Sequence, residues 1–96
     1  MGQVTMVDFW APWRGPCRAF HPHYERLARD HSSAALTFGR CNVDQNSRTA
    51  AMLGIQSILT LVLFNAHGNE VDRVVVVPDR ARLAELLEMA VRSAAH

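Results

Sequence analysis

Cys17 ends a short loop, Trp13 to Cys17, in which Gly15 and Pro16 separate an arginine from the cysteine. Two cysteines spaced two residues apart at the start of a helix exchange thiols with disulfides. The first attacks as a thiolate and the second resolves the mixed disulfide. Here Arg14 occupies the attacking position, and only Cys17, at the resolving position, retains sulfur. The sequence therefore predicts a loop without two-cysteine turnover.

Two interpretations of Cys17 stay open. A thiol shielded by apolar neighbours reacts slowly, so Cys17 can be an inert core side chain. Alternatively, it accepts a mixed disulfide as a single functional thiol. The other cysteine, Cys41, falls in a predicted strand, and we expect it to be a core residue that does not pair with Cys17. His21 follows Cys17 by four residues, but two ligands do not make a metal site, and we expect no metal and no cofactor.

Asp8 interrupts an apolar segment from Val4 to Trp10 that is typical of a strand buried on both faces. An isolated carboxylate in such surroundings is destabilising or stays protonated. A buried carboxylate with a shifted pKa marks a functional site only in some proteins, because structural ion pairs shift a pKa in the same way. A functional and a structural role of Asp8 both remain open.

Apolar periodicity and turn residues predict the elements that position these residues. Strands are expected at 4–10, 36–43, 59–64 and 71–77. Helices are expected after Pro16 with a kink at Pro22, from Asn46 or Ser47 to residue 53, and from residue 78 onward. The order β-α-β-α-β-β-α predicts an α/β fold with a parallel strand pair, an antiparallel hairpin and helices on both faces.

Composition sets the remaining limits. The 96 residues are enough for one domain, residues 1–96, and a formal net charge of +1 gives no reason to expect nucleic acid or a membrane as a partner. The four-valine run, 74–77, is far too short to span a bilayer. No basic segment followed by a long apolar one begins the sequence, so we expect a cytoplasmic protein.

Taken together, the motifs resemble the thioredoxin family over residues 4–87. The segments that carry this resemblance are Val7-Asp8-Phe9-Trp10-Ala11-Pro12-Trp13, Cys17-Arg18, Pro22, Asn42-Val43-Asp44-Gln45-Asn46, Gly54-Ile55-Gln56-Ser57-Ile58, Thr60-Leu61, Phe64 and Gly68. The resemblance implies a minimal thioredoxin fold, a mixed four-stranded sheet without the usual leading β-α unit. It also implies a disulfide oxidoreductase scaffold whose partners are a protein or peptide substrate and, in an active form, a thioredoxin reductase-like enzyme.

The same resemblance implies roles for individual residues. Asp8 matches the proton acceptor of the resolving cysteine, and Arg40 matches a neighbouring lysine, so a buried Asp8–Arg40 pair is expected. The implied substrate-binding positions are Trp13, Gly15, Pro16, Ile58 and Leu59.

Two departures from the family pattern alter these expectations. Arg14 replaces the nucleophile, and Leu59 replaces a cis-proline, so we expect the Ile58–Leu59 peptide bond to be trans. Without a leading strand, residues 36–43 become a sheet edge, which makes this edge a candidate for dimerisation. The sequence thus predicts a thioredoxin-like protein with an altered active site that lacks ordinary turnover. A single-thiol redox protein, a peptide-binding module and a drifted copy of an active enzyme are the alternatives.

Overall fold

Strands and helices alternate along the chain in the computed structural model, which describes residues 3–12, 15–56, 58–75 and 80–95. The elements are β1 (Val4–Trp10), α1 (Gly15–His31), β2 (Leu36–Asn42), α2 (Ser47–Met52), β3 (Thr60–Phe64), β4 (Glu70–Val75) and α3 (Arg80–Ala94). Their order is the predicted one.

The sheet has the strand order β2-β1-β3-β4. β1 runs parallel to β2, from the pair Val4↔Leu36 to the pair Trp10↔Asn42. β3 is antiparallel to both β1 and β4. The mixed α/β sheet with one parallel pair and one hairpin is therefore confirmed, and β2 is one of its two edges.

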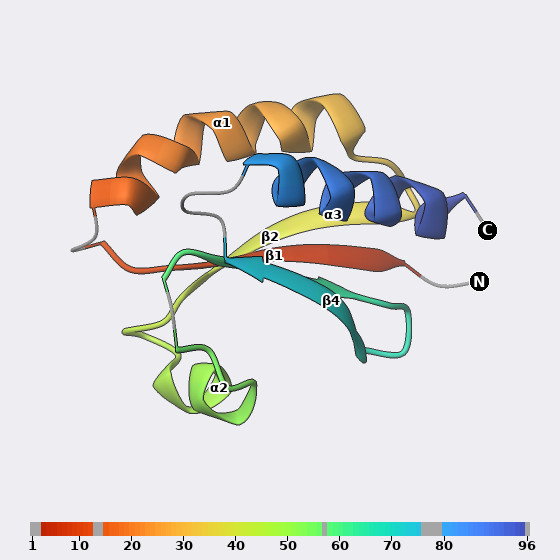
Figure 1. Cartoon of the computed structure of the whole chain (residues 1–96). Coiled ribbons are helices and arrows are strands. Elements are labelled where there is room, and N and C mark those ends of the chain that lie inside the picture. The colour runs from red at the N-terminus through yellow and green to blue at the C-terminus, as the bar shows by residue number, and fades with distance from the viewer. Residues whose placement is uncertain (1–2, 13–14, 57, 76–79, 96) are drawn as a thin grey trace.

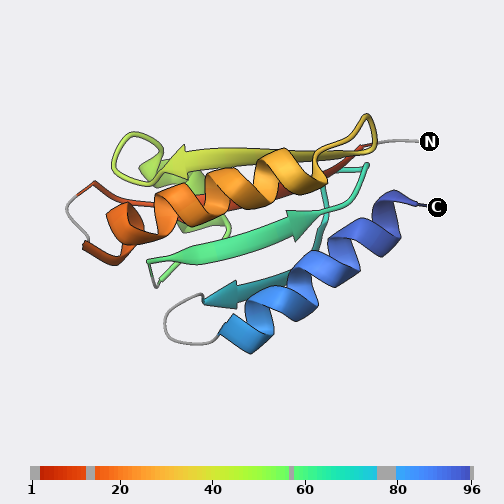
Figure 2. The ribbon, with the colours of Figure 1, turned by 90° about the horizontal axis from the view of Figure 1, so that it is seen from above.

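Helices cover both faces of this sheet. α1 and α3 lie over one face and α2 lies on the other (Figure 1), and α1 and α3 run beside each other when seen from above (Figure 2). The core lies under α1 and α3, where Met6, Leu61 and Leu63 of the sheet meet Leu86 of α3. The Tyr24 hydroxyl of α1 is 3.1 Å from the Met6 carbonyl oxygen and 2.8 Å from that of Gly39, which links α1 to both parallel strands.

Burial differs between the two faces of β1, which corrects the expectation that both are buried. Met6 and Asp8 are buried under the helices, whereas Thr5 and Val7 on the opposite face are only half-buried. The reason is that α2, only six residues long, covers one end of the opposite face (Figure 1). Among the described residues, no helix is long and apolar enough to cross a membrane.

Several predicted boundaries are corrected. The second strand ends at Asn42 rather than Val43, and the third begins at Thr60 rather than Leu59. β4 spans Glu70–Val75, and the predicted extension to residue 77 and the helix start at 78–79 lie outside the described residues.

Two local helix predictions also change. Asn46 precedes α2, but its side-chain oxygen accepts no capping hydrogen bond from the helix. The side chain is turned toward Asn42, and its Nδ2 donates to the Asn42 carbonyl oxygen at 2.9 Å. α2 ends at Met52 rather than Leu53, ahead of Gly54, whose φ is +66°. α1 is one helix from Gly15 to His31 with Pro22 inside it.

Arg73 of β4 joins the sheet to the end of α2. Its guanidinium forms a two-point ion pair with Glu70, in which both N···O distances are 2.6 Å. The same group donates to the carbonyl oxygens of Leu53 at 2.7 Å and Gly54 at 3.4 Å. α2 is thus tied by hydrogen bonds to the far edge strand.

Candidate functional site

Cys17 lies in the first turn of α1, where Gly15 begins the helix. Its side chain is 1% exposed and belongs to the same core cluster as Leu59. Pro16 is accommodated in this first turn because no intrahelical bond requires its missing N–H. The predicted positions Trp13 and Arg14 lie outside the described residues.

A pocket of about 260 Å³ opens beside the buried thiol. It is lined by Trp10, Cys17, Arg18, His21 and Arg40. Among the described residues that line this pocket, two are arginines and none is a carboxylate, which gives it a positive character suited to an anionic ligand or reagent.

Asp8 is held in the sheet next to this pocket. Its side chain is 1% exposed, and its Oδ2 is 3.5 Å from Nε of Arg40. Burial raises the pKa of Asp8 from 3.8 to about 6, against the opposing effect of the Arg40 charge and hydrogen bond. Its other oxygen, Oδ1, has no hydrogen-bond partner among the described residues. The contact with Arg40 therefore compensates only part of the cost of burying the Asp8 carboxylate.

Arg40 connects Asp8 to the pocket. It projects from β2, is directly paired with Asp8 in the parallel register, and lines the pocket with Cys17. Its guanidinium carbon is 4.2 Å from the centre of the Trp10 ring, a cation–π distance. The predicted Asp8–Arg40 contact is thus present, and Trp10 holds the arginine from a second side. The expectation that the whole pair is buried is corrected, because Asp8 is buried but Arg40, on β2, is exposed.

Leu59 lies in the core cluster that also contains Cys17, and Ile58 packs against that cluster. Leu59 is fully buried and Ile58 is half-buried. The Ile58–Leu59 peptide bond is cis, so the expectation of a trans bond is wrong. That expectation considered only the intrinsic preference of a peptide bond before a non-proline residue for the trans form. It did not consider the packed position that Leu59 takes in this fold.

Cys41 stands apart from this arrangement. It is free, as is Cys17, and it pairs with Phe9 in the sheet register. It is half-buried, which corrects the expectation of a core residue, because α2 leaves part of that sheet face open. Burial raises the pKa of the Cys41 thiol, so it is a weak nucleophile at neutral pH.

Sequence reasoning missed Arg18 and Trp10 as pocket residues. The sequence does contain a signal for both residues. Arg18 and His21 are three residues apart and so share one face of α1. Trp10 ends β1, and β1 pairs with β2, the strand that contains Arg40. His21 Nε2 is 2.5 Å from Oε1 of Glu25, while its Nδ1 has no partner among the described residues. Within the described ranges, no three His, Cys, Asp or Glu residues lie close enough to bind a metal ion together.

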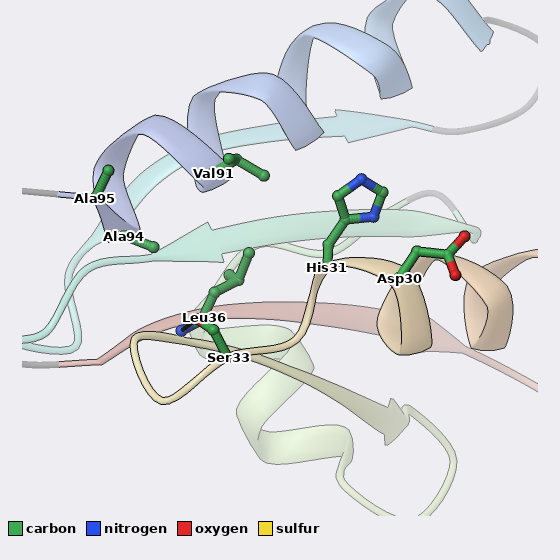
Figure 3. Close-up of a pocket in the computed structure, with 7 residues that line it drawn as sticks. All are labelled: Asp30, His31, Ser33, Leu36, Val91, Ala94 and Ala95. Atoms are coloured by element: carbon green, nitrogen blue, oxygen red, sulfur yellow. Dashed lines mark hydrogen bonds between the residues drawn. The ribbon is translucent and has the colours of Figure 1, made fainter.

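A larger pocket, about 350 Å³, lies at the opposite end of the sheet. Figure 3 shows its residues, which come from the ends of α1 and α3 and the start of β2: Asp30, His31, Ser33, Leu36, Val91, Ala94 and Ala95. None of the predicted site residues takes part in it.

Known proteins are similar to this chain both in sequence and in fold. The Thioredoxin family model matches residues 2–89. The chain belongs to the thioredoxin family. The thioredoxin of Staphylococcus saprophyticus subsp. saprophyticus is 42% identical over 85 residues, 88% of this chain and 80% of that protein. The thioredoxin of Chlamydia pneumoniae is 43% identical over 84 residues, 88% of this chain and 79% of that one.

Solved thioredoxin structures superpose on the chain. The X-ray structure of Fasciola hepatica thioredoxin matches with a TM-score of 0.81 and 34% identity, covering 93% of this chain and 82% of that one. The Malassezia sympodialis thioredoxin matches with a TM-score of 0.78 and 31% identity, covering 94% and 76%. The thioredoxin fold is therefore shown.

Proposed function

We propose that this thioredoxin-family protein has an altered active site and lacks ordinary dithiol–disulfide turnover. The observation that carries the proposal is that Cys17 is the loop's only sulfur, with Arg14 in place of the nucleophile. Cys41 does not replace the missing partner, since both cysteines are free and Cys41 lies in the sheet. Turnover needs two sulfurs that alternate between attack and resolution, and this loop supplies one.

The test is disulfide reduction in an insulin assay with dithiothreitol as the reductant. We expect the unaltered protein to match the rate without protein, and Arg14→Cys to reduce insulin. The matched control is Arg14→Ser, which removes the charge without adding sulfur and is expected to stay inactive. Leu59→Pro, added to Arg14→Cys, restores the family residue and is expected to raise the rate further. Insulin reduction by the unaltered protein that is lost in Cys17→Ser would contradict the proposal.

A second candidate is a single-thiol function of Cys17, and the pocket favours it. Cys17 forms part of the wall of a cavity that also presents Arg18 and Arg40. In this reaction the Cys17 thiolate attacks a disulfide, forms one new S–S bond and releases the other half as a thiolate. Asp8, with a pKa of about 6, is mostly ionised at pH 7.5, and we propose it as the acceptor of the thiol proton.

Mass spectrometry after treatment with oxidised glutathione separates the two candidates. The single-thiol function predicts one glutathione adduct on Cys17 that Cys17→Ser abolishes and Cys41→Ser retains. An adduct on Cys41 alone, or none at neutral pH, would reject it. In either function we propose a protein or peptide as the partner and the cytoplasm as the location, which the two free thiols support.

A further inference from the structure

The positive charge around Cys17 is local to its pocket. Arg18 follows Cys17 on α1 and is exposed, and Arg40 reaches the same pocket from β2. The chain as a whole has a formal net charge of only +1. The larger pocket at the other end of the sheet contains Asp30, and no arginine or lysine is among the described residues that line it. The side chains of the Cys17 pocket, rather than the charge of the whole chain, therefore attract an anion to it.

Arg40 is held in place by two contacts. Its Nε is 3.5 Å from Oδ2 of Asp8, and its guanidinium carbon is 4.2 Å from the centre of the Trp10 ring. The hydrogen bond to Asp8 uses Nε, one of the three guanidinium nitrogens. The two terminal nitrogens carry the remaining N–H groups, and parallel N–H groups of this kind bind a carboxylate at two points. Arg40 is thus a positioned group that loses little freedom when it binds a carboxylate.

Two carboxylates lie next to residues of the pocket. Asp8 contacts Arg40, and Glu25 contacts His21. Neither carboxylate is among the described residues that line the pocket. Asp8 offsets part of the Arg40 charge, but Arg18 adds a second cation, and the first turn of α1 contains no acidic residue. The N-terminus of a helix also carries a positive partial charge, so the pocket stays positive when Asp8 is ionised.

The size of the pocket limits what it holds. Its volume, about 260 Å³, lies below the about 300–1,000 Å³ of sites that enclose a small-molecule ligand. A pocket of this size holds one side chain of a larger ligand rather than a whole cofactor. Consecutive Cα atoms of a peptide are about 3.8 Å apart. An acidic residue next to a disulfide therefore brings its carboxylate to the arginines while the sulfur meets Cys17.

We propose that this pocket selects peptide disulfides that carry an acidic residue next to the disulfide, with Arg18 and Arg40 as the residues that determine this specificity. The proposal rests on the single-thiol function proposed for Cys17. The peptide carboxylate binds Arg40 at two points, and Arg18 adds a second positive charge. The Cys17 thiol gives its proton to Asp8, and the thiolate attacks one sulfur of the peptide disulfide. One S–S bond forms as the other breaks, so the Cys17 sulfur is oxidised and the released half of the peptide is reduced to a thiolate.

Three matched peptide disulfides test the selection. They are the symmetrical disulfides of the acetylated and amidated tripeptides Glu-Cys-Glu, Gln-Cys-Gln and Lys-Cys-Lys. Mass spectrometry measures the rate of adduct formation at Cys17 in a chain that carries Cys41→Ser. Each rate is divided by the rate of the same peptide with N-acetylcysteine amide, a neutral thiol, which removes differences in intrinsic reactivity. We expect the Glu peptide to react about fivefold faster than the Gln peptide and the Lys peptide to be slowest, with a difference that salt reduces.

Arginine variants assign this preference to the pocket. Arg18→Gln and Arg40→Gln are each expected to lower the preference for the Glu peptide severalfold, whereas Arg18→Lys keeps the charge and is expected to retain most of it. Arg29→Gln is the matched control, because Arg29 is exposed on the same helix and lies outside the pocket. It removes the same charge and is expected to leave the preference unchanged. Circular dichroism confirms the fold of each variant, and Arg18→Gln alone decides the matter if Arg40→Gln does not fold.

A peptide that cannot react separates this proposal from the single-thiol function. Acetylated and amidated Glu-Ser-Glu forms no disulfide, and NMR of the Trp10 indole N–H follows its binding. We expect a saturable shift that Gln-Ser-Gln does not produce and that Arg18→Gln weakens. Binding without any Cys17 adduct would reject the single-thiol function and keep the pocket as a site for acidic peptides.

Three results would overturn the selection while leaving the single-thiol function intact. The first is adducts that form on Cys17 at equal normalised rates with all three peptides. The second is a preference that Arg29→Gln lowers as much as Arg18→Gln does. The third is a Glu-Ser-Glu peptide that binds no better than Gln-Ser-Gln. The absence of both adducts and binding would reject both proposals.

Discussion

Replacing Asp8 with asparagine is expected to stabilise the protein at neutral pH. The Asp8 carboxyl has a pKa of about 6 in the folded chain against 3.8 as its ordinary value, chiefly because burial disfavours the ionised form. The folded state thus holds this proton more tightly than the unfolded state. A raised carboxyl pKa makes stability fall as pH rises from about 4 to about 6, with the full cost present above 6.

The size of the effect follows from the shift. Each pKa unit corresponds to 1.36 kcal/mol, so a change from 3.8 to about 6 amounts to about 3 kcal/mol. Asp8→Asn keeps the shape of the side chain and removes the charge, and it is expected to recover about this free energy of unfolding at pH 8. At pH 4, where the folded-state carboxyl is already protonated, the advantage is expected to shrink below about 1 kcal/mol.

Urea unfolding at pH 4, 6 and 8 measures this difference. Asp30→Asn is the matched control, because Asp30 is exposed on α1 and its substitution is expected to change stability little at any of the three values. The reasoning is refuted if Asp8→Asn is destabilising at pH 8, or if its gain does not depend on pH. The first result would mean that the Arg40 contact outweighs the burial of the carboxylate, and the second that the carboxyl has the same pKa in the folded and unfolded states.

Three further outcomes follow from burial and hydrogen bonding. Maleimide labelling of the native protein is expected to modify half-buried Cys41 at least about tenfold faster than Cys17, and peptide mass mapping measures the ratio. Tyr24→Phe leaves two carbonyl acceptors without their donor and is expected to lower the free energy of unfolding by about 1–3 kcal/mol in urea. Leu59→Ala at a fully buried position is expected to cost about 2–5 kcal/mol in the same assay, and a cost near zero would contradict its place in the core.

Much of the fold was predictable because it depends on short-range patterns. The apolar run from Val4 to Trp10 has the observed bounds of β1. Of the apolar positions predicted to share one face of the last helix, Leu83, Leu86 and Ala90 are buried, Leu87 is half-buried and Val91 is exposed. Boundaries elsewhere shifted by one or two residues, since the last residues of an element depend on tertiary contacts. The missing side-chain cap at Asn46 is an example, because this side chain is turned toward the Asn42 carbonyl oxygen, to which its Nδ2 donates.

The site was predictable in its residues but not in its environment. The resemblance placed Arg40 beside Asp8, and the structure has that contact. The half-buried state of Cys41 depends on how much of the sheet α2 covers, and the sequence does not specify that coverage. The cis bond at Ile58–Leu59 and the stacking of Arg40 on Trp10 likewise depend on segments distant in the sequence.

Arg73 joins two parts of the molecule that are distant in the sequence, β4 and the end of α2. Its bonds to the Leu53 and Gly54 carbonyl oxygens hold the end of α2 against β4, and Ile55 N in turn donates to Ala50 O. Holding one end of a loop shortens the part that is free to move, which lowers the entropy lost when the rest is ordered. An arginine on the outer strand therefore fixes the point from which the chain leaves α2.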